Sequence, residues 1–188
     1  MILRYNFNMK KIKYNLLFVP HFKDRIKLGL LRRKICKQVF STQALQFPVH
    51  MSVISGGFYV NDYQVFEKEL KHLLSKENSF YVEAEGDKSF VIPEKFWTGV
   101  HINRNSKITS LQHKLQNLRN NHTDDKKSLK EGQLHITFAF PAKVDELKPI
   151  KIPVSSLLID RITIVKKIGG ELAPYRIHKH INLDIIKS

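Results

Sequence analysis

The chain has 188 residues, of which 42% are hydrophobic and 26% charged, a balance typical of an ordinary folded protein. Its 32 lysines and arginines outnumber 17 acidic residues, and the resulting net charge of +15 favours an anionic partner such as nucleic acid. No apolar stretch is long enough to span a bilayer, and the single cysteine, Cys36, excludes an internal disulfide and a cysteine-based metal cluster.

Strand-like and helix-like patterns alternate along the chain. Apolar residues at helical spacing predict helices over Asp24–Phe40, Phe66–Leu74 and Ile108–Leu118. Short apolar runs predict strands at Tyr14–Val19, Val49–Ile54, Phe80–Ala84, Ser89–Ile92, Phe96–Ile102, Leu134–Phe140, Leu157–Lys166 and Tyr175–Leu183. The third and fourth runs flank Glu85-Gly86-Asp87-Lys88, which predicts a hairpin.

The order strand, helix, strand occurs once in each half of the chain, although the halves share no significant residue-by-residue identity. This order predicts an α+β fold that is bilobal, with two pseudo-symmetric β-α-β-type lobes and mostly antiparallel sheets around a central groove. We expect one two-lobed domain over residues 1–188. Met9 offers an alternative start, which would make residues 1–8 a dispensable extension.

The second strand of each unit carries a similar tripeptide, His50-Met51-Ser52 and His135-Ile136-Thr137. Residues two apart in a strand point to the same side, so each tripeptide presents an imidazole and a hydroxyl together. Two such pairs facing each other would supply a base, an acid and two hydrogen-bond donors, enough to cleave a phosphodiester without a metal. The alternative is a pair of structural histidines hydrogen-bonded inside a sheet.

These motifs resemble those of the two-histidine phosphoesterase superfamily, which contains 2′-5′ RNA ligase-like proteins and cyclic nucleotide phosphodiesterases. The likeness rests on Phe47–Val53 and Gln133–Phe138, on the opening strand Leu16–Val19, and on Ile159–Val165 before the last strand. The first motif departs mildly, with methionine and serine where a β-branched residue and threonine are more usual. Neither change removes a functional group that the chemistry needs.

The resemblance implies a bilobal α+β fold and chemistry on 2′,3′-cyclic phosphates or 2′-5′-linked nucleotides or RNA, with no metal or other cofactor. It assigns His50, Ser52, His135 and Thr137 as the catalytic set. Either histidine can be the base or the acid. The same groups acting in reverse would join ends, as a 2′-5′ RNA ligase does.

Substrate recognition would need aromatic platforms and basic residues beside this set. We expect Trp97, Tyr175 and Arg176 to contribute to substrate binding, with simple packing as the alternative for each. Other candidate aromatics are Phe22, Tyr59 and Phe140. His178 and His180 share a face of the predicted last strand, but no third ligand is evident, so we predict no metal site.

Two other functions fit the same residues. A non-catalytic, basic RNA-binding module could use the same fold, although retention of all four motif residues favours an enzyme. The third hypothesis is a cyclic phosphodiesterase that acts on a small molecule. In each case we expect a cytoplasmic protein with no membrane association and no obligate protein partner.

Overall fold

The computed structural model describes residues 12–54, 57–92, 97–126, 133–140, 148–169 and 173–185. The segment 1–8, predicted to be dispensable, lies outside these residues. Helices and strands together confirm the predicted α+β class. In chain order they are β1 (Ile12–Pro20), α1 (Phe22–Gln38), the 3-10 helix η1 (Gln43–Gln46), β2 (Met51–Ser52), α2 (Tyr63–Leu74), β3 (Phe80–Glu83), β4 (Phe90–Ile92), β5 (Trp97–Ile102), α3 (Ser106–Asn121), β6 (Leu134–Ala139), β7 (Ser156–Ile168) and β8 (Arg176–Asn182).

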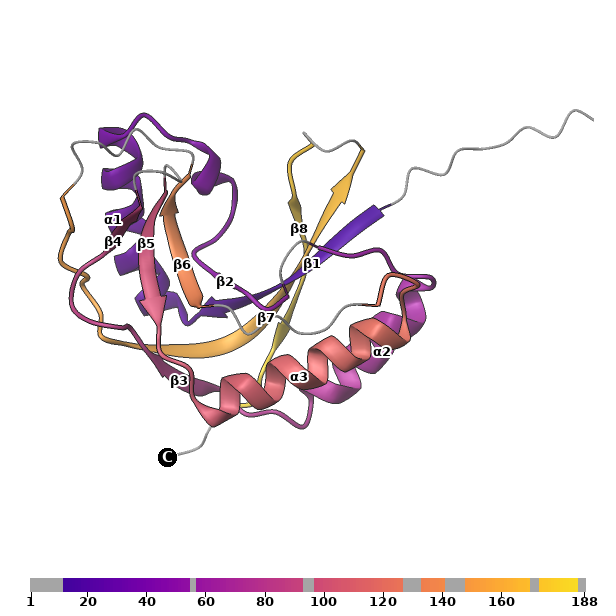
Figure 1. Cartoon of the computed structure of the whole chain (residues 1–188). Coiled ribbons are helices and arrows are strands. Elements are labelled where there is room, and N and C mark those ends of the chain that lie inside the picture. Colours follow the sequence, from indigo (N-terminus) through magenta and orange to yellow (C-terminus); the bar gives the residue numbers. More distant parts are fainter. Residues whose placement is uncertain are drawn as a thin grey trace, which may run out of the picture.

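The strands of the described residues join one curled sheet. Its order is β3-β7-β1-β2-β6-β5-β4, with β8 added beside β7, and each pairing between these strands is antiparallel, in agreement with the mostly antiparallel pairing that was predicted. In Figure 1, α1 lies behind the part of the sheet formed by β4, β5 and β6, whereas α2 and α3 lie side by side beneath β1, β7 and β8. The two short strands β2 and β6 are neighbours at the centre.

One row of side chains across the central strands faces the core. Phe18 of β1 pairs with Met51 of β2, and Met51 pairs with Ile136 of β6. All three side chains are completely buried. Because side chains alternate along a strand, the residues on either side of Met51 and Ile136 lie on the opposite face of the sheet. Both predicted tripeptides therefore have an apolar centre in the core and polar ends outside it.

The helices begin earlier than their apolar spacing predicts. Helix α2 starts at Tyr63 rather than Phe66, because the carboxylate of Asp62 accepts hydrogen bonds from the backbone N–H groups of the first turn. Asn105 caps α3 in the same way. Within the described residues, none of the helices combines the length and the apolar character needed to cross a membrane.

Strand β2 is shorter than the predicted run Val49–Ile54 and comprises only Met51 and Ser52. Pro48 cannot donate to a strand ladder, which limits pairing on the N-terminal side. The backbone N–H of Val53 still donates to Leu16 of β1, at 2.9 Å. His50 thus stands immediately before the strand.

The predicted hairpin between β3 and β4 is wrong. β3 pairs with β7 and β4 pairs with β5, so the two strands lie at opposite ends of the strand order. Turn residues such as those at 85–88 report a local change of chain direction and do not identify the strand partner. The 13-residue strand β7 offers β3 an apolar edge that β4, with three residues, does not.

Candidate active site

The pairing of β2 with β6 brings the two motifs together. Met51 lies opposite Ile136 in an antiparallel register. Continued by one residue in each direction, this register sets His50 opposite Thr137 and Ser52 opposite His135. Directly opposed residues have Cβ atoms about 5 Å apart, and diagonal pairs such as His50 and His135 are separated by roughly 7–8 Å. The four groups thus form a compact set on the face away from the core.

Each motif histidine is held by a backbone carbonyl two residues before it. Nδ1–H of His50 donates to the carbonyl oxygen of Pro48 at 2.8 Å, and Nδ1–H of His135 donates to that of Gln133 at 3.2 Å. A carbonyl oxygen can only accept, so Nδ1 carries the proton in both rings. When the rings are neutral, Nε2 is left as the basic nitrogen in each motif.

The two imidazoles differ in electrostatic surroundings. Burial lowers the pKa of His50 from 6.5 to about 4, against the opposing effect of the Pro48 carbonyl, and the nearby charges of Arg32 and His135 lower it further. Burial also lowers the pKa of His135, and the neighbouring His101 adds to this. Both rings are therefore neutral at pH 7 in the free protein.

Trp97 of β5 supports the second motif. Its indole Nε1–H donates to the hydroxyl oxygen of Thr137 at 3.2 Å. The indole also packs edge-to-face on the ring of His135, with centroids 4.4 Å apart. Since the hydroxyl oxygen accepts from Trp97, its own hydrogen remains free to be donated to a ligand. Trp97, predicted to bind substrate, thus contacts two motif residues directly.

The aromatic cluster around Trp97 continues along the sheet. Phe90 packs against the indole at 5.1 Å and stacks on His101 at 4.1 Å. His101 lies directly opposite His135 in the β5–β6 pairing. Gly99 is required here, because a Cβ at this position would meet the carbonyl oxygen of Ile136 at 2.3 Å. This close approach of β5 to β6 holds Trp97 over the motif.

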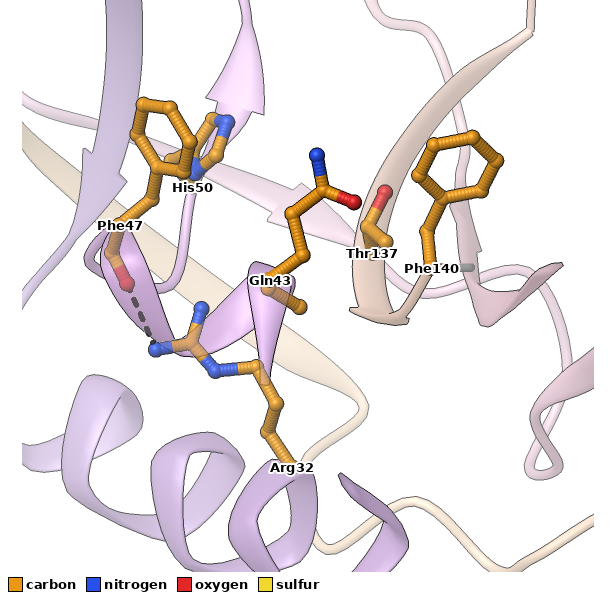
Figure 2. A pocket seen from close by; sticks show the side chains of 7 residues that line it. Arg32, Gln43, Phe47, His50, Thr137 and Phe140 are labelled. Atoms are coloured by element: carbon orange, nitrogen blue, oxygen red, sulfur yellow. Dashed lines mark hydrogen bonds between the residues drawn. The ribbon is translucent and has the colours of Figure 1, made fainter. Parts of the chain in front are cut away.

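A cavity of about 190 Å³ opens beside His50 and Thr137 (Figure 2). Side chains from α1, η1 and the segment before β2 form one side, and β6 with the residue after it forms the other. The lining residues are Arg32, Gln43, Ala44, Phe47, His50, Thr137 and Phe140. Phe140, one of the candidate aromatics, is thus at the cavity, whereas Phe22 lies at the start of α1 beneath the guanidinium of Arg25.

Arg32 is a cavity residue that the sequence analysis missed. It occupies a core-facing position of α1, one turn from Leu28 and near Ile35, both of which are completely buried. The sequence did contain a signal for this residue, since an arginine stands at helical spacing with apolar residues that are buried. Such positions rarely hold a charge without a functional or structural partner.

Tyr175 reaches the site through an aromatic neighbour. Its ring lies 5.8 Å from that of Phe47, which in turn lies 5.6 Å from the imidazole of His50. Lys167 places its ammonium over the Tyr175 ring at 5.6 Å. The residue is therefore close to the first motif but does not line the cavity.

Arg176 lies on the other face of the sheet. It pairs with Lys166, which pairs with Tyr14, and Tyr14 stacks on Tyr63 of α2 at 4.7 Å. Cross-strand partners share a face, so Arg176 is on the side covered by α2. The structure thus brings six of the seven predicted site residues to one region, with Arg176 apart.

The two histidines of β8 do not share neighbours. The β7–β8 pairing shifts between Ile164 and Val165, and His178 is the residue left without a partner in the register. His178 packs on Tyr63 at 5.0 Å, whereas Nδ1 of His180 is hydrogen-bonded to the Thr163 hydroxyl at 2.8 Å. Across the described residues, no group of three or more His, Cys, Asp or Glu side chains could hold a metal.

Comparison with known proteins finds the same fold in solved structures. No protein-family model and no curated protein sequence matches the chain. The crystal structure of Escherichia coli LigT complexed with 3′-AMP superposes with a TM-score of 0.62 at 13% identity, over 92% of this chain and 98% of LigT. Protein TT0787 of Thermus thermophilus gives 0.63 at 10% identity, over 93% and 99%.

A further crystal structure, described as a phosphoesterase, gives a TM-score of 0.58 at 12% identity over 92% of this chain and 98% of that one. LigT has also been crystallised with ATP, with NADP+ and with phosphate. The chain therefore has the LigT-like fold along nearly its whole length. The resemblance predicted from the two motifs is confirmed at the level of the fold.

Proposed function

We propose that the protein is a two-histidine phosphoesterase that hydrolyses 2′,3′-cyclic phosphate ends or 2′-5′-linked nucleotides or RNA without a metal. The observation that carries this proposal is the β2–β6 pairing, since it gathers both histidines and both hydroxyls on one sheet face. The shared fold supports it, because LigT binds 3′-AMP, ATP and NADP+. The net charge of +15 also suits an anionic substrate.

In the proposed reaction, His50 is the general base and His135 the general acid. The low pKa of His50 keeps its Nε2 lone pair available above about pH 4. Nε2 takes a proton from water as the water oxygen attacks phosphorus. The bond from phosphorus to one ribose oxygen breaks, and that oxygen receives a proton from Nε2 of His135. A phosphate anion bound between the rings raises the pKa of His135 and so favours the protonated form.

Ser52 and Thr137 would donate to the non-bridging phosphoryl oxygens, whose negative charge grows as the water attacks. The hydroxyl of Thr137 is oriented for this by Trp97, whose indole N–H donates to one of the two lone pairs on the hydroxyl oxygen. The reverse reaction, in which a ribose hydroxyl attacks in place of water, would give 2′-5′ RNA ligase activity. Water at cellular concentration favours hydrolysis.

We further propose that the single domain is built of two equivalent lobes. The unit β1-α1-β2 corresponds to β5-α3-β6, and the strand order β1-β2-β6-β5 is consistent with a pseudo-twofold axis between the motif strands. Each lobe then contributes one His-x-hydroxyl pair to the shared site. We also propose that the protein acts on nucleotides and that it does so in the cytoplasm.

The competing proposal is a non-catalytic RNA-binding module, which the strong positive charge favours. A panel of 2′,3′-cyclic AMP, 2′-5′ oligoadenylate and an RNA with a cyclic phosphate end, each assayed with and without EDTA, separates the possibilities. We expect turnover of at least one substrate, undiminished by EDTA, and none with the H50A/H135A double variant. Turnover of the mononucleotide alone would indicate a small-molecule enzyme. RNA binding without turnover of any substrate would instead support the binding module.

A further inference from the structure

Arg32 is a buried cation at the edge of the cavity. The residue is only 7% exposed, yet it lines the same cavity as His50 and Thr137. Nη2 donates to the backbone carbonyl of Phe47 at 2.8 Å, and the buried Nε has no hydrogen-bond partner among the described residues. The structure shows no carboxylate paired with this guanidinium within the same residues.

Such an arrangement is costly in the absence of a ligand. A buried charge needs an opposite charge or full hydrogen bonding, and one carbonyl provides neither for a group with five N–H donors. Burial accordingly lowers the pKa of Arg32, and its charge also contributes to the low pKa of His50. Among the described residues, Arg119 is also a buried arginine with an unpartnered Nε, but its guanidinium has the carboxylate of Asp125 and the amide oxygen of Asn120 as partners.

The cavity has the chemistry to supply the missing anion. Figure 2 shows Arg32 and Gln43 extending from α1 and η1 toward the side where His50 and Thr137 lie. An arginine fork, an amide, a hydroxyl and an imidazole together match the oxygens of a phosphate group, and a guanidinium can engage two of them at once. None of the described residues that line this cavity carries a carboxylate that would repel an anion.

We propose that Arg32 is a phosphate-binding residue, whose guanidinium holds non-bridging oxygens of a phosphate group in the cavity alongside the hydroxyl of Thr137. This inference rests on the proposed function for the identity of the substrate, although phosphate binding itself does not require turnover. The bound anion supplies an opposite charge and further acceptors to the guanidinium of Arg32. It also balances the positive charge that otherwise disfavours protonation of His50.

The test compares Arg32→Met with Arg33→Met, the next residue of the same helix, which is exposed. Binding of inorganic phosphate is measured by calorimetry, and thermal unfolding confirms that each variant is folded. We expect Arg32→Met to weaken phosphate binding by roughly tenfold or more, as for the loss of a charge-assisted bidentate contact. Arg33→Met should change it by less than about twofold, because an exposed charge is screened.

Arg32→Lys keeps the charge without the fork and should bind phosphate with intermediate affinity. If Arg32→Met does not fold, Arg32→Lys takes its place in the test. A phosphate affinity that falls from wild type to Arg32→Lys to Arg32→Met would follow the charge and shape of the side chain, whereas loss of the hydrogen bond to Phe47 alone predicts no such order. Wild-type phosphate affinity in a folded Arg32→Met, or in Arg32→Lys where the methionine variant does not fold, would overturn the proposal. Arginine-dependent phosphate binding in a protein that turns over no substrate would leave this inference standing and remove the proposed enzyme.

Discussion

The two motif histidines share a backbone anchor but differ in what surrounds them. Both donate from Nδ1 to the carbonyl two residues earlier. His50 is next to a buried arginine and lines the open cavity, whereas His135 is beside Trp97 and a third histidine. The identical anchors leave Nε2 as the reactive atom in each. The different surroundings are the basis for the roles that we propose, with a persistently neutral base at His50 and an acid at His135 that depends on bound phosphate.

The largest expected effect is the loss of either ring. We expect His50→Ala and His135→Ala each to lower kcat/KM by two or more orders of magnitude, because each removes one proton transfer. Steady-state kinetics on the best substrate of the panel measures this. His72→Ala, at an exposed position near the end of α2, is the matched control and should be unchanged. A normal rate in either motif variant would exclude the role proposed for that ring.

The hydroxyls should matter less than the rings and unequally. Thr137→Val is expected to lower kcat by about 10- to 1,000-fold with a smaller change in KM, as for removal of one donor to a developing oxyanion. Ser52→Ala should cost less, because the structure records a bond from Trp97 that orients only the threonine hydroxyl. Measurement of kcat and KM separately for both variants tests this order. Equal losses would indicate that Trp97 contributes no orientation.

The pH dependence follows from the two lowered pKa values. The base must be neutral, so kcat/KM should hold until the pH falls toward the His50 pKa of about 4, then decrease about tenfold per unit. The acid must be protonated, and burial lowers the pKa of His135 below 6.5, so kcat/KM should also decrease from below pH 6.5 upward. The expected profile for free enzyme and substrate is a bell with an acidic optimum. The pH profile of kcat should lie at higher pH than that of kcat/KM, since a bound phosphate raises the pKa values of both His50 and His135. An alkaline optimum in kcat/KM would contradict the proposed roles of His50 as base and His135 as acid with lowered pKa values.

The smallest expected effect belongs to Trp97. Trp97→Phe retains an aromatic ring against His135 but removes the N–H donor, and we expect kcat to decrease by roughly 2- to 10-fold, the value of one neutral hydrogen bond. When Trp97→Phe is introduced into the Thr137→Val variant, kcat should change little further, because the hydroxyl oxygen that accepts from Trp97 is already absent. Kinetics of the four-member cycle measures this coupling. Full additivity would show that the indole acts independently of the hydroxyl.

Much of the local structure could be predicted from spacing. The helices and the long strands lie close to their predicted positions, because apolar periodicity generally reflects which face of an element is buried. Helix α1 departs from this, since Ile26 and Leu30 of its apolar spacing are exposed. The misplaced features are those that depend on distant partners. The predicted β3–β4 hairpin is wrong because β3 pairs with β7 instead. His178 and His180 do not share a face because of a shift in the β7–β8 register. Arg32 was missed because its importance arises only where α1 meets the segment before β2.

By itself, the sequence determined which residues can do chemistry and how each tripeptide divides between core and surface, since alternation along a strand is a local property of the backbone. Only the tertiary structure decided that β2 pairs with β6 in the register Met51 to Ile136. Strand partners are selected by packing over the whole core rather than by neighbouring residues, and a slip of one position would turn one motif toward the core. The proposed function depends on that register.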